Sequence, residues 1–393
     1  RMYRDGKGVE KNTTKAILMY DKAIKSMPST EYSNELLNLL DIRGNNDDYF
    51  EFIKKYKDDN VIVFSRIYLD YVSKTYLEYG FKAISQLCLS IYSQINANNC
   101  SICVKKINTI LNIVKQTSRE NKVPCEIGEF FLEIPKNNNL SVVHKTSLLL
   151  MSYFDTFCKK HNLQYSLAFG TMLGCERHHG FVPWDDDVDL YMERSELEKL
   201  IPLMEKDPNL RLLSYVVYQY EKLFRVYKVQ FKDNYSLFLD IFVLDYVSGI
   251  NCNWSKYSEL REEFYCEFKE KFGSGPTTSS VLSNNPEVQS YIDRYIHKLQ
   301  VEMNDSSDKK SLIWGIENCP IRKEYIYSYE SYFPIRECVF EGCTFEIAND
   351  PMKLLEISYG DIYSLPNDIF SHNHYTTRQI ADMEKTYKKY VLK

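Results

Sequence analysis

The strongest constraint on this chain is a run of negative charge set inside an apolar segment. Four aspartates occupy five positions just after the apolar stretch 181–184: Asp185, Asp186, Asp187 and Asp189. Alternate side chains of an extended strand share a face, so a strand here would place Asp185, Asp187 and Asp189 together. Two carboxylates 4 Å apart repel each other by about 1 kcal/mol in water, and by several times that when partly buried. The segment therefore predicts a strand that needs a cation beside it.

The chemistry of these ligands indicates which cation. Hard oxygen ligands at close quarters favour Mg²⁺ or Mn²⁺, and a bridging carboxylate can organise a two-metal site for phosphoryl transfer. The alternative is a solvated acidic turn or a calcium loop. The run lacks the glycine and distal glutamate of an EF-hand loop, and apolar residues flank it on both sides. We therefore favour a metal site.

A further carboxylate lies within the apolar stretch 238–244. Burying an unpaired aspartate is costly, so Asp240 is interpreted as a metal ligand on a neighbouring strand, with a satisfied structural carboxylate as the alternative. Asp245, at the end of this stretch, is expected to be a turn or cap residue. The predicted catalytic and metal-binding residues are Asp185, Asp187, Asp189 and Asp240.

A predicted phosphate-binding turn precedes the acidic segment. A strand over 163–170 is expected to turn into a helix at Gly170 and Thr171, with Gly174 completing the turn. Backbone amides, the threonine hydroxyl and the helix amino terminus of such a turn can hold a phosphate. The planar fork of Arg177 could grip a diphosphate. Lys228, on a predicted strand before Asp240, is either a phosphate contact or a surface residue.

The histidines at 178 and 179 are expected to be loop residues rather than general bases. A histidine can act as a base near neutral pH, but histidines in surface loops are common.

The chain is expected to hold two domains, at residues 1–135 and 140–393, with the polar stretch 135–139 between them. The first is predicted to be all-helical, with apolar residues at helical spacing through 33–115. Its opening resembles the second half of a Sel1-like repeat, a relative of the tetratricopeptide repeat. The resemblance rests on these residues: Tyr3, Gly6, Gly8, Val9, Lys15, Ala16, Tyr20, Lys22 and Ala23. One repeat cannot bury its own apolar face, so further stacked helices and a possible protein partner are expected there.

The second domain is predicted to be α/β (α+β) with a mixed sheet, because its strands alternate with helices without regular βαβ spacing. Helices are expected at 143–158, 195–204 and 254–272, and strands at 215–220, 225–231 and 238–244. The polar run 273–285 is expected to be a loop, and 340–347 a hairpin.

Composition narrows the partners and the compartment. The net charge is −5, with 49 Lys and Arg against 54 Asp and Glu, so no global positive field favours nucleic acid. No apolar run approaches the roughly 20 residues of a membrane-spanning helix. The 11 cysteines are irregularly spaced, which suits reduced thiols in a cytoplasm, with peripheral association at the inner membrane face left open. For Cys100 and Cys103, ordinary thiols are favoured over a zinc site.

Several segments together resemble the LicD family. They are the GT-x-LG segment 170–174, Arg177, the Gly-Phe pair 180–181, the PWDDD-x-D segment 183–189, the segment 238–245 and the late segment 359–366. The resemblance covers roughly residues 140–374. The family includes bacterial phosphorylcholine transferases, is similar to fukutin-type ribitol-phosphate transferases, and belongs to the nucleotidyltransferase-fold superfamily. It implies a nucleotidyltransferase-like mixed-sheet core with metals on the four aspartates named above.

The resulting hypothesis is a metal-dependent phosphotransferase. A hydroxyl of a glycan or lipid-linked glycan would attack a nucleotide-activated donor, with a CDP-alcohol favoured, and a nucleoside monophosphate would leave. One alternative is nucleotidyl transfer on the same fold. The other is a catalytically silent scaffold in which the helical module binds a partner.

Overall fold

The computed structural model of the protein describes residues 8, 10, 13–26, 35–36, 66–96, 98–117, 123–219, 222–248, 250–273, 280–281, 285–303, 310–315, 318, 325–367, 369 and 375–391. The chain forms two compact units. The helical unit comprises Arg1–Ile134 and Tyr363–Phe370, and the sheet unit comprises Pro135–Ile362 and Ser371–Lys393.

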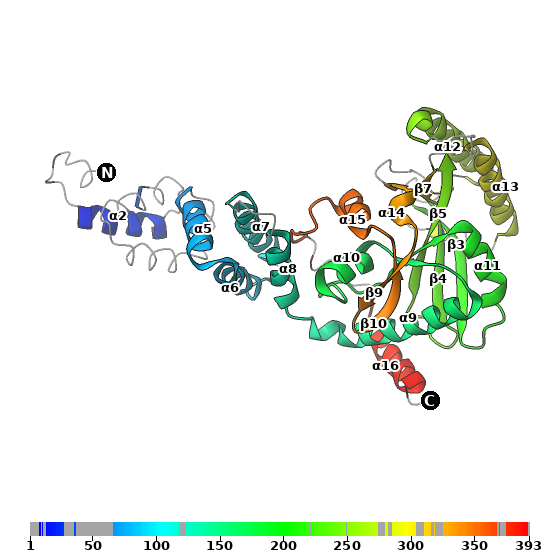
Figure 1. The fold of residues 1–393 in the computed structure, drawn as a ribbon, viewed down its shortest axis with the longest axis horizontal. Coiled ribbons are helices and arrows are strands. Elements are labelled where there is room, and N and C mark those ends of the chain that lie inside the picture. The colour runs from blue at the N-terminus through cyan, green and yellow to red at the C-terminus, as the bar shows by residue number, and fades with distance from the viewer. Residues whose placement is uncertain are drawn as a thin grey trace. The chain divides into compact units, whose positions relative to one another are not determined.

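The helical unit contains five described helices (Figure 1). They are α2 (Thr13–Ser26), α5 (Arg66–Tyr79), α6 (Phe81–Tyr92), α7 (Cys100–Thr117) and α8 (Val123–Glu133). Fully buried apolar residues from α6, α7 and α8, including Ile84, Ile107 and Phe130, form its core. The predicted helical character is confirmed where the structure describes it.

Helix α8 was not predicted. The polar and proline-containing character of residues 116–139 suggested looser structure, but a proline in the first helical turn is tolerated because its missing N–H has no partner there. The residues that suggested a Sel1-like repeat are described only at Gly8 and within α2, so the repeat remains a prediction.

A segment from near the end of the chain completes the helical unit. We call residues 363–370 the return segment. The side chain of Asn108 in α7 donates to the carbonyl of Leu365 at 2.8 Å and accepts from its N–H at 2.7 Å. Lys115 donates to the carbonyl of Tyr363 at 3.2 Å, and the Cys100 thiol lies 3.9 Å from the carbonyl of Asn367. The late motif 359–366 is therefore divided between the two units.

The sheet unit is built on an eight-stranded sheet in the order β1-β2-β5-β4-β3-β6, with β7 pairing β5 and β8. The strands are β1 (Ser166–Leu167), β2 (Asp189–Glu193), β3 (Leu210–Gln219), β4 (Lys222–Phe231), β5 (Leu239–Ser248), β6 (Ser280–Val281), β7 (Lys310–Trp314) and β8 (Ile326–Ser328). β2 and β5 are parallel and the remaining pairs are antiparallel, which confirms the mixed sheet. β9 (Arg336–Phe340) and β10 (Cys343–Ile347) form the predicted hairpin.

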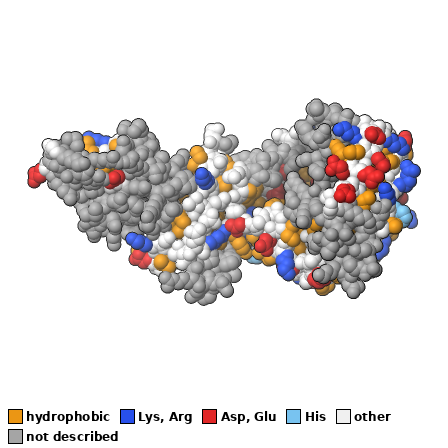
Figure 2. Space-filling view, turned by 90° about the horizontal axis from the view of Figure 1, so that it is seen from above, with side chains coloured by type: hydrophobic (Ala, Val, Ile, Leu, Met, Phe, Trp, Pro, Cys, Tyr) orange, Lys and Arg blue, Asp and Glu red, His pale blue; other side chains and the backbone are white. Residues whose placement is uncertain are grey.

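The described helices of the sheet unit are α9 (Ser141–His161), α10 (Phe169–His178), α11 (Arg194–Met204), α12 (Ile250–Phe272), α13 (Pro286–Met303), α14 (Tyr329–Tyr332), α15 (Pro351–Tyr359) and α16 (Thr377–Val391). The helices predicted at 143–158, 195–204 and 254–272 are present as α9, α11 and α12, whereas α13, α14 and α16 were not predicted. Acidic and basic side chains are interspersed on the exposed face over α12 and α13 (Figure 2). None of the helices that the structure describes is long and apolar enough to cross a membrane.

Two strand predictions were too long. The strand expected over 163–170 is reduced to β1, because helix α10 already begins at Phe169. The strand expected through all four acidic positions begins only at Asp189, since Pro183 and Trp184 form a turn and the Asp185 N–H donates to the carbonyl of Val182. Most of the predicted loop 273–285 lies outside the described residues.

Candidate active site

Two of the predicted aspartates face each other on neighbouring strands. Asp189 at the start of β2 is in register with Asp240 on parallel β5, and Lys228 on β4 is in register with Asp240 on its other side. The Lys228 ammonium lies 2.8 Å and 3.0 Å from the two carboxylate oxygens of Asp240. It also lies 3.3 Å from the ring centroid of Phe238. The carboxylate predicted to be buried therefore has a cationic partner.

The other two aspartates come from the loop that leads into β2. The backbone carbonyl of Asp185 lies 2.7 Å from Nε2 of His144, whose ring stacks on Phe181 at a centroid distance of 4.3 Å. The Asp185 carboxylate lies against Gly170 in the first turn of α10, where a side-chain carbon would overlap with its Oδ2. The absence of a side chain at Gly170 lets the carboxylate approach the helix backbone this closely.

Electrostatic interactions link the four carboxylates. Burial raises the pKa of Asp185, followed by the charge of Asp187 and a hydrogen bond with that residue. Burial also raises the pKa of Asp189, followed by the charges of Asp187, Asp240 and Asp185, while Lys228 lowers it. The four side chains thus converge, although only Asp189 and Asp240 lie on strands.

Whether these residues fit a divalent ion can be judged from their chemistry and their partners. Carboxylate oxygens are the ligands that Mg²⁺ and Mn²⁺ prefer, and the mutual repulsion of the four groups would be offset by a cation. Within the described ranges, no three acidic, histidine or cysteine side chains are already spaced around a single ion. Asp240 pairs with Lys228, and Asp185 is hydrogen-bonded to Asp187. The four carboxylates fit a divalent ion, provided that Asp240 releases Lys228 and Asp185 releases Asp187 when they bind it.

The residues of the predicted phosphate turn divide into two groups. Gly170 and Thr171 lie in the first turn of α10, beside Asp185 and Asp189. The Thr171 hydroxyl is buried and accepts a hydrogen bond from the Asp189 N–H at 2.9 Å, so it positions the strand that carries this aspartate. Gly174 lies deeper in α10, where an added side chain would overlap with the carbonyl of Gly180. It allows close packing and does not complete the turn, contrary to the expectation.

Arg177 is also placed differently from the expectation. Its side chain is buried, donates to the carbonyl of Ile362 at 2.6 Å and to Nε2 of His178 at 3.1 Å, and lies 5.8 Å from the Trp184 ring. The guanidinium fork thus ties α10 to the chain just before the return segment. Residues 371–374, which include two late histidines, lie outside the described residues.

Two tyrosines near the aspartates were missed by residue-level reasoning. Desolvation and the charges of Asp189 and other acidic residues raise the pKa of Tyr359, although 46% of this residue is exposed. Only the family resemblance of the late motif pointed to this residue. Tyr375 is buried, and its hydroxyl has no hydrogen-bond partner among the described residues. Burial raises its pKa, followed by the charges of Asp186, Asp187 and Asp240. No sequence signal marked Tyr375.

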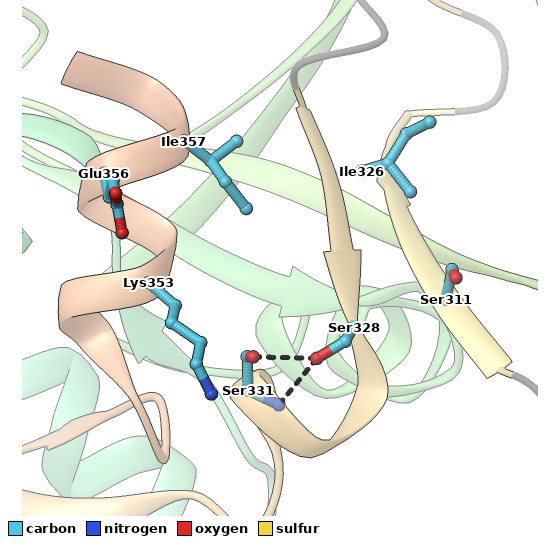
Figure 3. A pocket seen from close by; sticks show the side chains of 7 residues that line it. All are labelled: Ser311, Ile326, Ser328, Ser331, Lys353, Glu356 and Ile357. Carbon is cyan, nitrogen blue, oxygen red and sulfur yellow. Dashed lines mark hydrogen bonds between the residues drawn. The ribbon is translucent and has the colours of Figure 1, made fainter. Parts of the chain in front are cut away.

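A separate cavity of about 500 Å³ lies elsewhere in the sheet unit (Figure 3). It is lined by Ser311, Ile326, Ser328, Ser331, Lys353, Glu356 and Ile357, and by none of the four aspartates. The Ser328 hydroxyl caps α14 by accepting from the Ser331 N–H, and Lys353 pairs with Asp350 at 3.0 Å. Since these polar groups already have structural partners, the aspartate cluster is the stronger candidate site.

Comparison with known proteins agrees with the cluster. Residues 162–282 match the LicD/FKTN/FKRP nucleotidyltransferase domain. These residues form a LicD-family domain. The match includes the first turn of α10, β2, β4 and β5, and so all four aspartates. The chain is 27% identical over 240 residues to the lipopolysaccharide cholinephosphotransferase LicD of Haemophilus influenzae, covering 56% of this chain and 89% of that protein. It is 28% identical over 170 residues to an uncharacterized protein of Rickettsia prowazekii, covering 39% and 59% respectively. The LicD domain supports an enzyme that transfers phosphorus-containing groups.

Proposed function

We propose that this protein transfers a phosphorylated alcohol from a nucleoside-diphosphate donor, with a CDP-alcohol favoured, to a hydroxyl of a cell-surface glycan. The observation that carries the proposal is the convergence of four carboxylates beside the first turn of α10, within a LicD domain. The relative from Haemophilus influenzae, whose name specifies cholinephosphate transfer to lipopolysaccharide, supports this class of transferred group and acceptor.

Each part of the cluster has a role in this proposal. Asp185, Asp187, Asp189 and Asp240 would hold Mg²⁺ or Mn²⁺, which when bound neutralises phosphate charge and lowers the pKa of a coordinated hydroxyl. The first turn of α10 offers backbone N–H groups to a donor phosphate. Lys228, which pairs with Asp240, supplies a positive charge within reach of the same phosphate.

The proposed reaction forms a bond between the acceptor oxygen and the phosphorus that bears the alcohol. The bond from this phosphorus to the nucleoside monophosphate breaks, and the monophosphate leaves with the electron pair. The acceptor proton would pass to a carboxylate oxygen of one of the four aspartates.

Nucleotidyl transfer on the same fold is the second candidate, and the description of the matched domain as a nucleotidyltransferase domain favours it. In that reaction, attack falls on the nucleoside-bearing phosphorus. The nucleotide then stays on the acceptor, and the phosphorylated alcohol is released.

The released product separates the two candidates. The full chain is incubated with CDP-choline, Mg²⁺ and lipopolysaccharide, and the nucleotide products are separated by chromatography. CMP release with choline phosphate on the acceptor supports phosphotransfer, whereas free choline phosphate with a nucleotide on the acceptor refutes it. Asp187→Asn serves as the inactive control. EDTA should stop either reaction, so metal dependence alone does not discriminate.

A further inference from the structure

The segment that leads into β2 carries two of the four aspartates but has no regular structure of its own. We call residues 179–188, between the end of α10 and the start of β2, the aspartate loop. It contains bends and one turn but neither helix nor strand. The hydrogen bonds of a helix or strand therefore do not fix the backbone around Asp185 and Asp187. The position of these carboxylates must depend on contacts with other elements.

His144 in α9 holds the acidic end of the loop. Its Nε2 lies 2.7 Å from the carbonyl oxygen of Asp185. A carbonyl oxygen only accepts hydrogen bonds, so Nε2 carries the proton and donates it. The imidazole ring is buried and stacks face to face on Phe181, with a centroid distance of 4.3 Å and an angle of 1° between the rings. One side chain thus contacts the loop at two positions.

Glu341, in the turn between β9 and β10, holds the other end. Its N–H donates to the carbonyl of His179 at 3.0 Å, and its Oε1 accepts from the Phe181 N–H at 3.1 Å. Lys136 donates to both carboxylate oxygens at 2.7 Å. A side-chain carbon at Gly180 would overlap with this carboxylate. The loop therefore lies tightly against Glu341 over three successive residues.

The backbone of Glu341 is unusual for its residue type. Its φ is 49°, in the left-handed region that few residues other than glycine adopt. Glu341 and Gly342 form the two-residue turn of the hairpin, and both have positive φ. Turns of this kind prefer asparagine, aspartate or glycine at the first position, not glutamate. Strained positions concentrate at functional sites, so the contact with the aspartate loop accounts for the glutamate better than the turn does.

We propose that His144 and Glu341 are positioning residues, which hold the aspartate loop so that its carboxylates share a divalent ion with those on β2 and β5. His144 acts through the backbone carbonyl of Asp185, and Glu341 acts through the backbone N–H of Phe181. Neither has to touch the ion or the substrate. This inference rests on the proposed function, because it concerns the metal site of that reaction.

Mg²⁺ affinity, measured by calorimetry on the full chain without substrate, tests this proposal. His144→Phe keeps the ring beside Phe181 but removes the hydrogen bond to the Asp185 carbonyl. Loss of a residue that orients metal ligands typically costs about 10- to 100-fold in affinity, and we expect a loss in that range. His144→Gln keeps an N–H donor and should recover most of the affinity. A residue with a merely structural role would lower the melting temperature without this selective recovery.

His161→Phe is the matched control. His161 lies at the end of the same helix, and its ring packs on Phe157 at a centroid distance of 4.6 Å. The same substitution there should leave the Mg²⁺ affinity unchanged.

Glu341→Asn separates positioning from stability. Asparagine suits the turn, but its side chain is one methylene shorter and falls short of the Phe181 N–H. The exposed ion pair with Lys136 contributes little to stability. The melting temperature of the metal-free protein should therefore hold while the Mg²⁺ affinity falls about 10- to 100-fold.

Wild-type affinity in both His144→Phe and Glu341→Asn would overturn the proposal, and so would equal losses in His144→Phe and His161→Phe. If wild type itself binds no Mg²⁺, the proposed metal-dependent reaction fails together with the positioning role. If the variants lose affinity as expected but wild type transfers no phosphorylated alcohol, the positioning role stands and the proposed reaction fails.

Discussion

Gly170→Ala adds a single methyl group and tests whether the close approach of the Asp185 carboxylate to helix α10 matters for activity. The added Cβ would lie well inside 3.0 Å of Asp185 Oδ2 and 3.5 Å from its Cγ, so the carboxylate oxygen must retreat by about 1 Å. The carboxylate is the end of a flexible side chain, and no left-handed backbone is involved, so the free energy of unfolding should change by less than about 1 kcal/mol. Displacing a catalytic group by about 1 Å can cost about 100-fold in rate, and we expect a loss of that size.

The assay measures CMP release across a Mg²⁺ titration, together with thermal unfolding of the metal-free protein. Gly128→Ala in α8 is the control, because its Cβ would make only an ordinary contact, 3.8 Å from Cε1 of Tyr363. It should leave turnover unchanged. Wild-type turnover and Mg²⁺ dependence in Gly170→Ala would refute the role given to Asp185. A large fall in the melting temperature would show instead that the glycine is needed for folding.

Three further outcomes are expected. Asp187→Asn should stabilise the metal-free protein more at pH 7 than at pH 5. The folded-state pKa of Asp185 is raised above its unfolded value by burial and by the charge of Asp187, so the free energy of unfolding falls as pH rises from the unfolded pKa towards the folded pKa. The variant removes the charge of Asp187 and therefore part of this loss. A difference in melting temperature that is independent of pH would contradict this. Asp245→Ala should lower the free energy of unfolding by about 3–5 kcal/mol, because it removes one side of a buried ion pair in which Arg194 lies 2.5 Å and 2.7 Å from the Asp245 oxygens. Denaturant titration measures this change, and a loss below about 1 kcal/mol would show that other contacts of Arg194 compensate for the lost carboxylate. Tyr375→Phe removes a buried hydroxyl without a described partner, so the melting temperature should hold while donor affinity falls about ten-fold; unchanged affinity would exclude the hydroxyl as a ligand contact.

Local pattern predicted several of the helices and strands and the crowding of the aspartates. The period of two placed Asp240 in an apolar strand, and the crowding of charge near Asp189 indicated a shared site. The length of the acidic strand was overestimated because an alternating pattern does not reveal a turn at Pro183 and Trp184.

Partners distant in the sequence were not predictable from local pattern. A buried arginine that binds a carbonyl looks the same in sequence as one that binds a diphosphate, so the contact of Arg177 with Ile362 was missed. Asp245 was expected to be a cap because its partner, Arg194, lies 51 positions away. Tyr375 approaches the aspartates only through the tertiary fold.

The return segment has a consequence for the order in which the protein is made. Asn108 and Leu365 are 257 positions apart, and ribosomes add about 5–20 residues each second. Roughly 13–50 s therefore pass between the synthesis of Asn108 and the synthesis of its hydrogen-bond partner Leu365. During that interval the nascent helices lack the strip of backbone that later covers α7, and a chaperone or another nascent chain has access to that surface. A helical fragment ending at Ile134 would remain in this unfinished state, and aggregation of that fragment, relieved by a peptide of residues 363–370, is the outcome we expect.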